Sequence, residues 1–153
     1  MNLIIFFTSY FIIIASVIGY GSILQKVFNK KLNLEFEYSL LSTILFLIVI
    51  SFFTHFFLSH NYLHNGVIII FGLFFFFIMI IKDKKLFKSY AKYILLIFSI
   101  LFFGLLIAKS HDDFIYYHFP YTYYLTQENL IVGTGNLNHG FRTPSSIFYL
   151  NSL

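Results

Sequence analysis

The chain has 153 residues, of which 59% are hydrophobic and only 10% are charged, and its mean hydropathy is +0.82. This composition lies far outside that of soluble domains, so it excludes a soluble enzyme or nucleic-acid-binding module and predicts an integral membrane protein. The formal net charge is +4 and there is no cysteine, which excludes disulfides, thiol catalysis and cysteine-ligated zinc.

Four hydrophobic segments predict membrane-spanning helices, at residues 3–24, 38–58, 66–81 and 93–108. The first is a run of 22 residues without a charge, long enough to cross a hydrocarbon core of about 30 Å. No positive segment precedes it, and it is longer than the apolar core of a signal peptide, so we expect an uncleaved span. The fourth is short, but Lys92 and Lys109 can extend it by snorkelling to the interfaces.

Lysines predict the orientation of these spans. The loop at residues 25–37 and the segment at residues 82–92 are rich in lysine, whereas the turn at residues 59–65 has no lysine or arginine. Loops rich in Lys and Arg stay on the cytoplasmic side of a membrane, and successive loops alternate between its two sides. We therefore expect the N-terminus, the turn and residues 111–142 on the outer side.

Residues 111–142 hold three of the six histidines and the only arginine. Two patterns occur there, D-x3-Y-H-x-P from Asp113 to Pro120 and G-x-G-N-L-x-H-G from Gly133 to Gly140, and Arg142 and S-S-x-F (Ser145 to Phe148) follow. The segment resembles the first large outer loop of a poorly characterised bacterial group of polytopic membrane proteins. That group is similar to the GT-C glycosyltransferases. The resemblance covers roughly the last third of the chain; in the better-known GT-C enzymes the acidic outer loop follows the first span, whereas here it follows the fourth.

This resemblance implies the N-terminal part of an enzyme of the bacterial inner membrane. Such an enzyme transfers a sugar from a polyprenyl-phosphate carrier to a cell-surface glycan or lipid acceptor. Asp113, with Asp112 as second candidate, would be the general base. The remaining candidates are substrate-binding residues, namely Tyr117, His118, His139 and Arg142. The alternative reading is a non-catalytic component of polysaccharide export, or a transporter.

Several of these residues have a second explanation. Asp113 can cap the helix expected at residues 114–126, by accepting a free backbone N–H. The five tyrosines of that segment suit a helix lying at the membrane interface, with Pro120 kinking it. Arg142 has a planar fork that suits bidentate contact with phosphate, but it can equally be a headgroup anchor.

A divalent metal ion is the only cofactor that the sequence suggests. Its predicted ligands are His111, Asp112 and Asp113, and His118, His139, His60 and His64 are further possible donors. Their spacing matches no closed zinc motif, and a single outer-loop histidine is more often a hydrated surface residue.

The expected fold is therefore an all-α integral membrane protein. Four spans occupy residues 1–110, an outer loop with an interfacial helix occupies residues 111–142, and a further helix starts in residues 143–153. Residues 133–136 read as a glycine turn, and Thr143 and Pro144 as the N-cap and first position of the last helix. That helix stops short of a span, so we expect a fragment that is inactive alone. The expected partners are the lipid bilayer and a polyprenyl-phosphate sugar, without nucleic acid.

Overall fold

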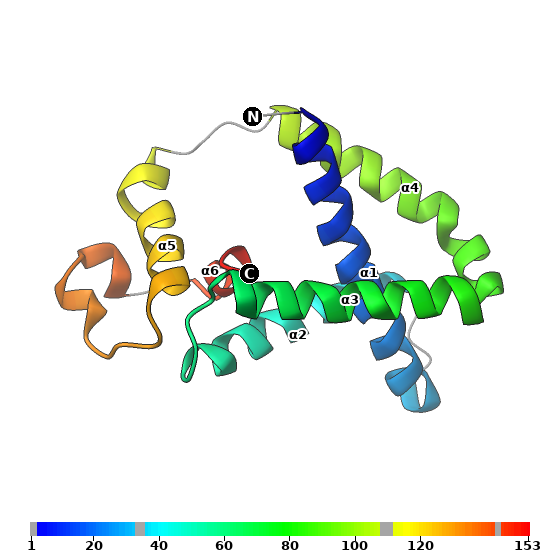
Figure 1. Ribbon diagram of the computed structural model, residues 1–153, viewed down its shortest axis with the longest axis horizontal. Helices are drawn as coiled ribbons and strands as arrows, with labels where there is room; N and C mark the ends of the chain where they lie inside the picture. The colour runs from blue at the N-terminus through cyan, green and yellow to red at the C-terminus, as the bar shows by residue number, and fades with distance from the viewer. Residues whose placement is uncertain (1–2, 33–35, 108–111, 143–144) are drawn as a thin grey trace. The chain divides into compact units, whose positions relative to one another are not determined.

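The computed structural model describes residues 3–32, 36–107, 112–142 and 145–153, and across these ranges it is helical and has no strand. Its elements are shown in Figure 1: α1 (Leu3–Leu32), α2 (Phe36–His55), α3 (Tyr62–Lys82), α4 (Lys84–Ile107), the π-helical turn η1 (Phe114–His118), α5 (Phe119–Gln127), the 3-10 turns η2 (Thr134–Asn136) and η3 (His139–Arg142), and α6 (Ile147–Asn151). The all-α prediction is thus confirmed for the described residues.

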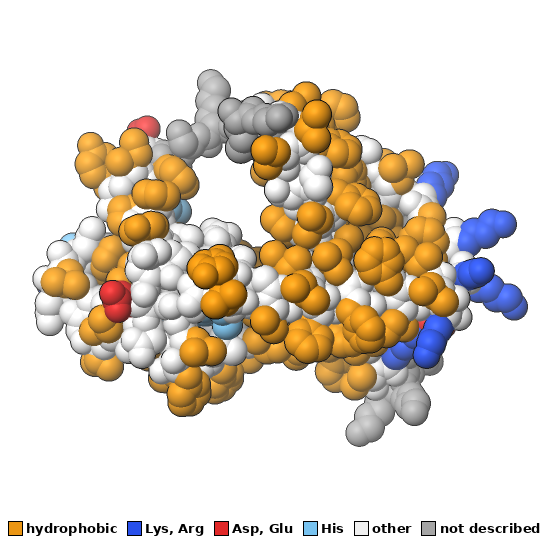
Figure 2. Space-filling model, in the orientation of Figure 1, with side chains coloured by type: hydrophobic (Ala, Val, Ile, Leu, Met, Phe, Trp, Pro, Cys, Tyr) orange, Lys and Arg blue, Asp and Glu red, His pale blue; other side chains and the backbone are white. Residues whose placement is uncertain are grey.

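Among the described residues, three helices are long and apolar enough to cross a membrane, namely Leu3–Phe28 within α1, Tyr38–His55 within α2, and Tyr62–Lys82 of α3. They correspond to the first three predicted spans. Apolar side chains cover much of the visible surface (Figure 2), which suits contact with lipid better than contact with water. In α4 only Ile94–Ile107 is apolar, about 20 Å of helix against a core of about 30 Å. The fourth span therefore stays a prediction.

Two helices reach into segments for which the sequence predicts loops. α1 continues past residue 24 as far as Leu32, and α4 begins at Lys84, well before residue 93. These lysine-rich stretches contain no glycine or proline, and Lys, Gln and Leu are good helix formers, so polarity alone does not end a helix there. The prediction of loops at residues 25–32 and 84–92 was wrong for this reason, whereas the ends of the spans themselves stay predictions.

The turn between α2 and α3 is also placed differently from the prediction. α2 ends at His55, three residues early, where the N–H groups of residues 56 and 57 donate to carbonyls only three residues back, as at the tightened end of a helix. α3 begins at Tyr62, because the Asn61 side-chain oxygen accepts from the N–H groups of residues 63 and 64, both at 3.1 Å. Asn61 is therefore the N-cap of α3, and the helix begins four residues earlier in the chain than the predicted start at residue 66.

The described residues form two compact units. The first is drawn from Met1–Thr43 and Ile69–Lys109, and the second from Ile44–Ile68 and Ser110–Leu153. α2 and α3 contribute residues to both. The second unit therefore contains the two segments that the lysine pattern assigns to the outer side, residues 59–65 and 111–142. The first contains the lysine-rich segment 82–92.

α1 and α3 cross at a point where both lack side-chain bulk. A Cβ atom built on Gly19 would lie 1.9 Å from the Gly72 carbonyl oxygen, and one on Gly72 would lie 1.9 Å from Ser16 Oγ. The backbones meet because glycine and serine line the crossing, as is common between membrane helices. Around the crossing, the first unit buries a small apolar core formed by Ala15, Ile18, Phe76 and Met79.

The core of the second unit joins α5 to α6. Its buried members are Tyr121 and Leu125 of α5 and Phe148 and Tyr149 of α6, and the ring centroids of Tyr121 and Phe148 are 5.4 Å apart. α6 is too short to be stable as an isolated helix, so this aromatic packing is what holds it. The last helix of the prediction is present from Ile147, whereas Thr143 and Pro144 lie outside the described residues.

Candidate functional site

The two predicted catalytic acids lie where the helix of the outer segment begins. Asp112 is in a turn, Asp113 occupies the N-cap position of η1, and both side chains are exposed. Asp113 has a helical backbone conformation and its side chain makes no capping hydrogen bond. Capping therefore does not account for this carboxylate, which is exposed to solvent. His111 lies outside the described residues.

A π-helical turn directly precedes Pro120, where the sequence predicts a kink. The Phe119 N–H donates to the Phe114 carbonyl five residues back, which is the π-helical pattern. Pro120 then falls in the first turn of α5, where its missing N–H is tolerated. The helix predicted at residues 114–126 is confirmed, with this wider turn at its start.

Tyr117 and His118 are partly buried and share a support in α6. The ring centroid of Phe148 lies 5.2 Å from that of Tyr117 and 5.2 Å from that of His118, both edge to face. The Tyr117 ring also lies 6.3 Å from the Phe141 ring. These ring contacts restrict the rotamers of the two predicted substrate-binding residues, which is what a binding site requires of its side chains.

The glycine-rich segment folds back onto the turn that carries Tyr117. A Cβ atom on Gly140 would lie 2.7 Å from the Tyr117 ring, so only glycine allows this contact. Nearby, the Asn138 side-chain amide donates to the Tyr116 carbonyl at 3.4 Å. Gly133 has a φ of 95°, which confirms the predicted turn at residues 133–136. The two halves of the sequence pattern thus meet in one structure.

Arg142 and His139 lie in η3 and are exposed. The Arg142 Nε donates to the Gly135 carbonyl at 3.3 Å, and a Cβ atom on Gly135 would lie only 2.8 Å from Arg142 Cγ. Within the described residues the two terminal nitrogens of the guanidinium have no partner. Anchored at Nε, Arg142 presents these two nitrogens to solvent, where a phosphate could bind both.

The tyrosines of the outer segment divide into two groups. Tyr116 and Tyr123 are 78% and 56% exposed and fit the predicted interfacial role. Tyr121 is buried instead, and this burial, reinforced by a hydrogen bond with Tyr149, raises its pKa above the usual value of 10. It is a neutral packing residue in the core of the second unit. Tyr121 is therefore an exception to the interfacial role that suits most of these tyrosines, because α6 covers it.

Three histidines gather between the ends of α2 and α3. The ring centroids of His55 and His60 are 5.0 Å apart, and those of His60 and His64 are 4.8 Å apart and stacked. His60 is fully buried; its Nε2 lies 3.0 Å from the Ser51 carbonyl oxygen and its Nδ1 lies 2.6 Å from Ser152 Oγ. Only a donor suits a carbonyl, so the proton is assigned to Nε2 of a neutral ring.

Burial, reinforced by the neighbouring rings of His55 and His64, lowers the pKa of His60 to about 4. This histidine is therefore neutral at physiological pH, and its hydrogen bond to Ser152 connects the α2–α3 turn to the end of α6. His55 is also fully buried; the Leu58 carbonyl lies close to its ring without a well-formed hydrogen bond to it. The sequence offered one signal for this group, three histidines within residues 55–64, but their contact with α6 is tertiary.

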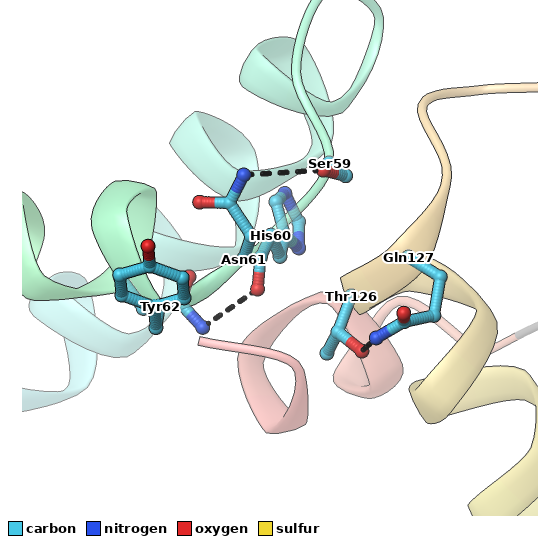
Figure 3. Close-up of a pocket in the computed structure, with 7 residues that line it drawn as sticks. Ser59, His60, Asn61, Tyr62, Thr126 and Gln127 are labelled. Carbon is cyan, nitrogen blue, oxygen red and sulfur yellow. Dashed lines mark hydrogen bonds between the residues drawn. The ribbon is translucent and has the colours of Figure 1, made fainter.

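A polar pocket of about 570 Å³ opens beside this turn (Figure 3). Its lining comes from the turn, the first turn of α3 and the end of α5: Ser59, His60, Asn61, Tyr62, Asn65, Thr126 and Gln127. The two sides are tied together where the His60 N–H donates to the Leu125 carbonyl at 2.9 Å. The lining has hydroxyls and amides but no charged group, so it suits an uncharged polar ligand. Asp113 is at the other end of the helix, roughly 20 Å away at 1.5 Å per residue.

Metal binding is not supported beyond the sequence pattern. Across the described parts of the chain, no three His, Asp or Glu side chains are placed so that they could hold a metal ion. His111 falls outside those parts, so the ligand set His111, Asp112 and Asp113 stays a prediction. His60 does not continue a helix toward His64, as a shared site would need, but lies in the turn before α3.

Comparisons with known proteins identify no relative of this chain. No protein family, curated protein or solved structure matches the chain.

Proposed function

We propose that this chain is the N-terminal part of a GT-C type membrane glycosyltransferase. It transfers a sugar from a polyprenyl-phosphate carrier to a cell-surface glycan or lipid acceptor, on the outer side of the bacterial inner membrane. The observation that carries the proposal is the contact between the two halves of the motif, Gly140 on Tyr117 and Asn138 on the Tyr116 carbonyl. The motif residues belong to one folded unit, as a shared site requires, although they are separated in sequence.

In the proposed reaction Asp113 takes the proton of an acceptor hydroxyl, with Asp112 next to it as the second candidate. The hydroxyl oxygen forms a bond to the anomeric carbon, the bond from that carbon to the phosphate oxygen breaks, and its electrons stay on the phosphate. Arg142 stabilises this developing charge through the two guanidinium nitrogens that have no protein partner among the described residues. Tyr117, His118 and His139 contact the substrate around these groups.

The direct test is transfer of radiolabelled sugar from polyprenyl-phosphate donors by the full-length protein in membranes. Asp113→Asn removes the base and keeps the shape, so transfer should fall about 10²- to 10⁴-fold with expression and membrane insertion unchanged. Glu128→Gln is the matched control, since it neutralises another exposed acid at the far end of α5. Full activity of Asp113→Asn would remove Asp113 as the base.

Failure of every donor with a folded, inserted protein would count against transfer itself. That outcome would favour the alternative, a non-catalytic component of polysaccharide export or a transporter.

A further inference from the structure

Four lysines of α4 lie on one side of the helix. At 100° per residue, Lys84, Lys85, Lys88 and Lys92 fall within an arc of about 100°, and all four side chains are exposed. Lys82, the last residue of α3, lies next to them in the chain and is also exposed. Figure 2 shows lysine side chains gathered where α3 leads into α4. We call the four α4 residues the lysine stripe.

The lysine-rich segment at residues 82–92 contains one acidic residue, and its carboxylate already forms an ion pair. Asp83, between α3 and α4, forms an ion pair with Lys26 of α1. The Asp83 carboxylate therefore balances the charge of a lysine outside the stripe. Among the described residues no carboxylate forms an ion pair with the stripe, so its four positive charges repel one another and favour an external anion.

The side of α4 that bears the stripe becomes apolar further along the helix. Leu95, Phe103 and Leu106 fall within the same arc, and their side chains are 66%, 62% and 55% exposed. The other side of α4 packs against the first-unit core through Phe87 and Ile94. In a membrane protein such an exposed apolar side contacts acyl chains. The lysines on the same side thus face the headgroups of the same lipids, because their long stems reach the interface.

We propose that the lysine stripe is a binding site for the phosphates of anionic phospholipids, such as phosphatidylglycerol, in the cytoplasmic leaflet. Four to eight basic residues directly beside a span suffice for such recognition. A soluble phosphate compound would need no apolar continuation of the site, and the stripe has one in Leu95, Phe103 and Leu106. The proposal does not depend on sugar transfer, so either idea can fail without the other.

The test compares two spin-labelled lipids on the full chain in phosphatidylcholine nanodiscs. Electron spin resonance gives the association of spin-labelled phosphatidylglycerol relative to spin-labelled phosphatidylcholine. We expect the native chain to prefer phosphatidylglycerol by about fivefold at low salt, and by less in high salt. Replacing all four stripe lysines by glutamine should bring the ratio close to one. Replacing them by arginine should keep the preference, because the charge is retained.

A charge-matched control separates a site from overall positive charge. Lys84→Gln with Lys88→Gln removes two charges from the stripe, and Lys30→Gln with Lys31→Gln removes two from the other lysine-rich segment. Equal losses in the two double variants would overturn the site, as would a native chain without preference or loss of preference on arginine substitution. Displacement of the lipid by inorganic phosphate, at an ionic strength at which sodium chloride displaces none, would overturn the lipid assignment in favour of a soluble ligand.

Discussion

His60 is a single residue that makes the stability of the second unit depend on pH. Its ring is fully buried between Ser51, Ser152 and two other histidines, and its pKa is lowered to about 4 by that burial. Above pH 6.5 the ring is neutral in both the folded and the unfolded chain, so pH has no effect through it. Between pH 6.5 and about 4 only the unfolded chain binds the proton, so acid favours unfolding.

Thermal unfolding in detergent, followed by circular dichroism, should therefore show a loss of stability from pH 6.5 to 4. The loss through His60 is up to about 3 kcal/mol, at 1.36 kcal/mol per pKa unit. His60→Gln retains a side-chain donor without a titrating ring and should flatten this dependence. His139→Gln, which replaces an exposed histidine of the same unit, should leave it unchanged. An equally steep loss in His60→Gln would show that other groups cause it.

Arg142 is the residue at which guanidinium geometry itself can be tested. Its Nε is held by the Gly135 carbonyl, which leaves two nitrogens for the phosphate of the proposed donor. Arg142→Lys keeps the charge and loses the fork, so the transfer rate should fall roughly ten- to a hundredfold, the loss of a charge-assisted hydrogen bond. Donor titrations of both proteins measure this. An unchanged rate would leave Arg142 as a headgroup anchor.

At the scale of elements, the crossing of α1 and α3 depends on the absence of Cβ atoms. Gly19→Ala would place its methyl group 1.9 Å from the Gly72 carbonyl oxygen, so the helices would have to separate. Overpacking of this kind usually destabilises by about 1–3 kcal/mol, and a backbone contact cannot yield as a side chain can. Unfolding in detergent should show the loss.

Gly66→Ala is the matched control, since a Cβ atom there has nothing within 4 Å. In α3 it should stabilise by up to about 1 kcal/mol through helix propensity alone. A neutral Gly19→Ala variant would mean that α1 and α3 do not meet at these residues.

At the scale of the whole molecule, the distribution of lysines predicts which ends of the spans face outward. We expect residues 59–65 outside and residues 82–92 inside, by the positive-inside rule. The natural chain has no cysteine, so single cysteines report positions without background. In intact cells Ser59→Cys should react with a membrane-impermeant maleimide, and Lys85→Cys should react only after permeabilisation. The reverse pattern would contradict the orientation and the outer placement of Asp113.

Composition and the length of the apolar runs determined the class of this protein. Runs of apolar residues as long as a bilayer core is thick favour helices, which satisfy the backbone in lipid. Of the four predicted spans, three correspond to described helices that are long and apolar enough to cross a membrane. The glycine turn at residues 133–136 also followed, because a positive φ is a local requirement that glycine meets. The helix after Asp113 was predicted as well, although the Asp113 side chain does not cap it. Helix ends were predicted less well, since lysines continue a helix as readily as leucines.

Only the tertiary structure decided which polar residues are buried together. The contact of His60 with Ser152, 92 residues apart, and the cover of α6 over Tyr121 join distant segments whose spacing carries no period. The same is true of the contact between Gly140 and the Tyr117 ring, which brings the two halves of the motif together. Such contacts depend on how helices pack, because a hydrophobic pattern specifies that a face is covered and not which segment covers it.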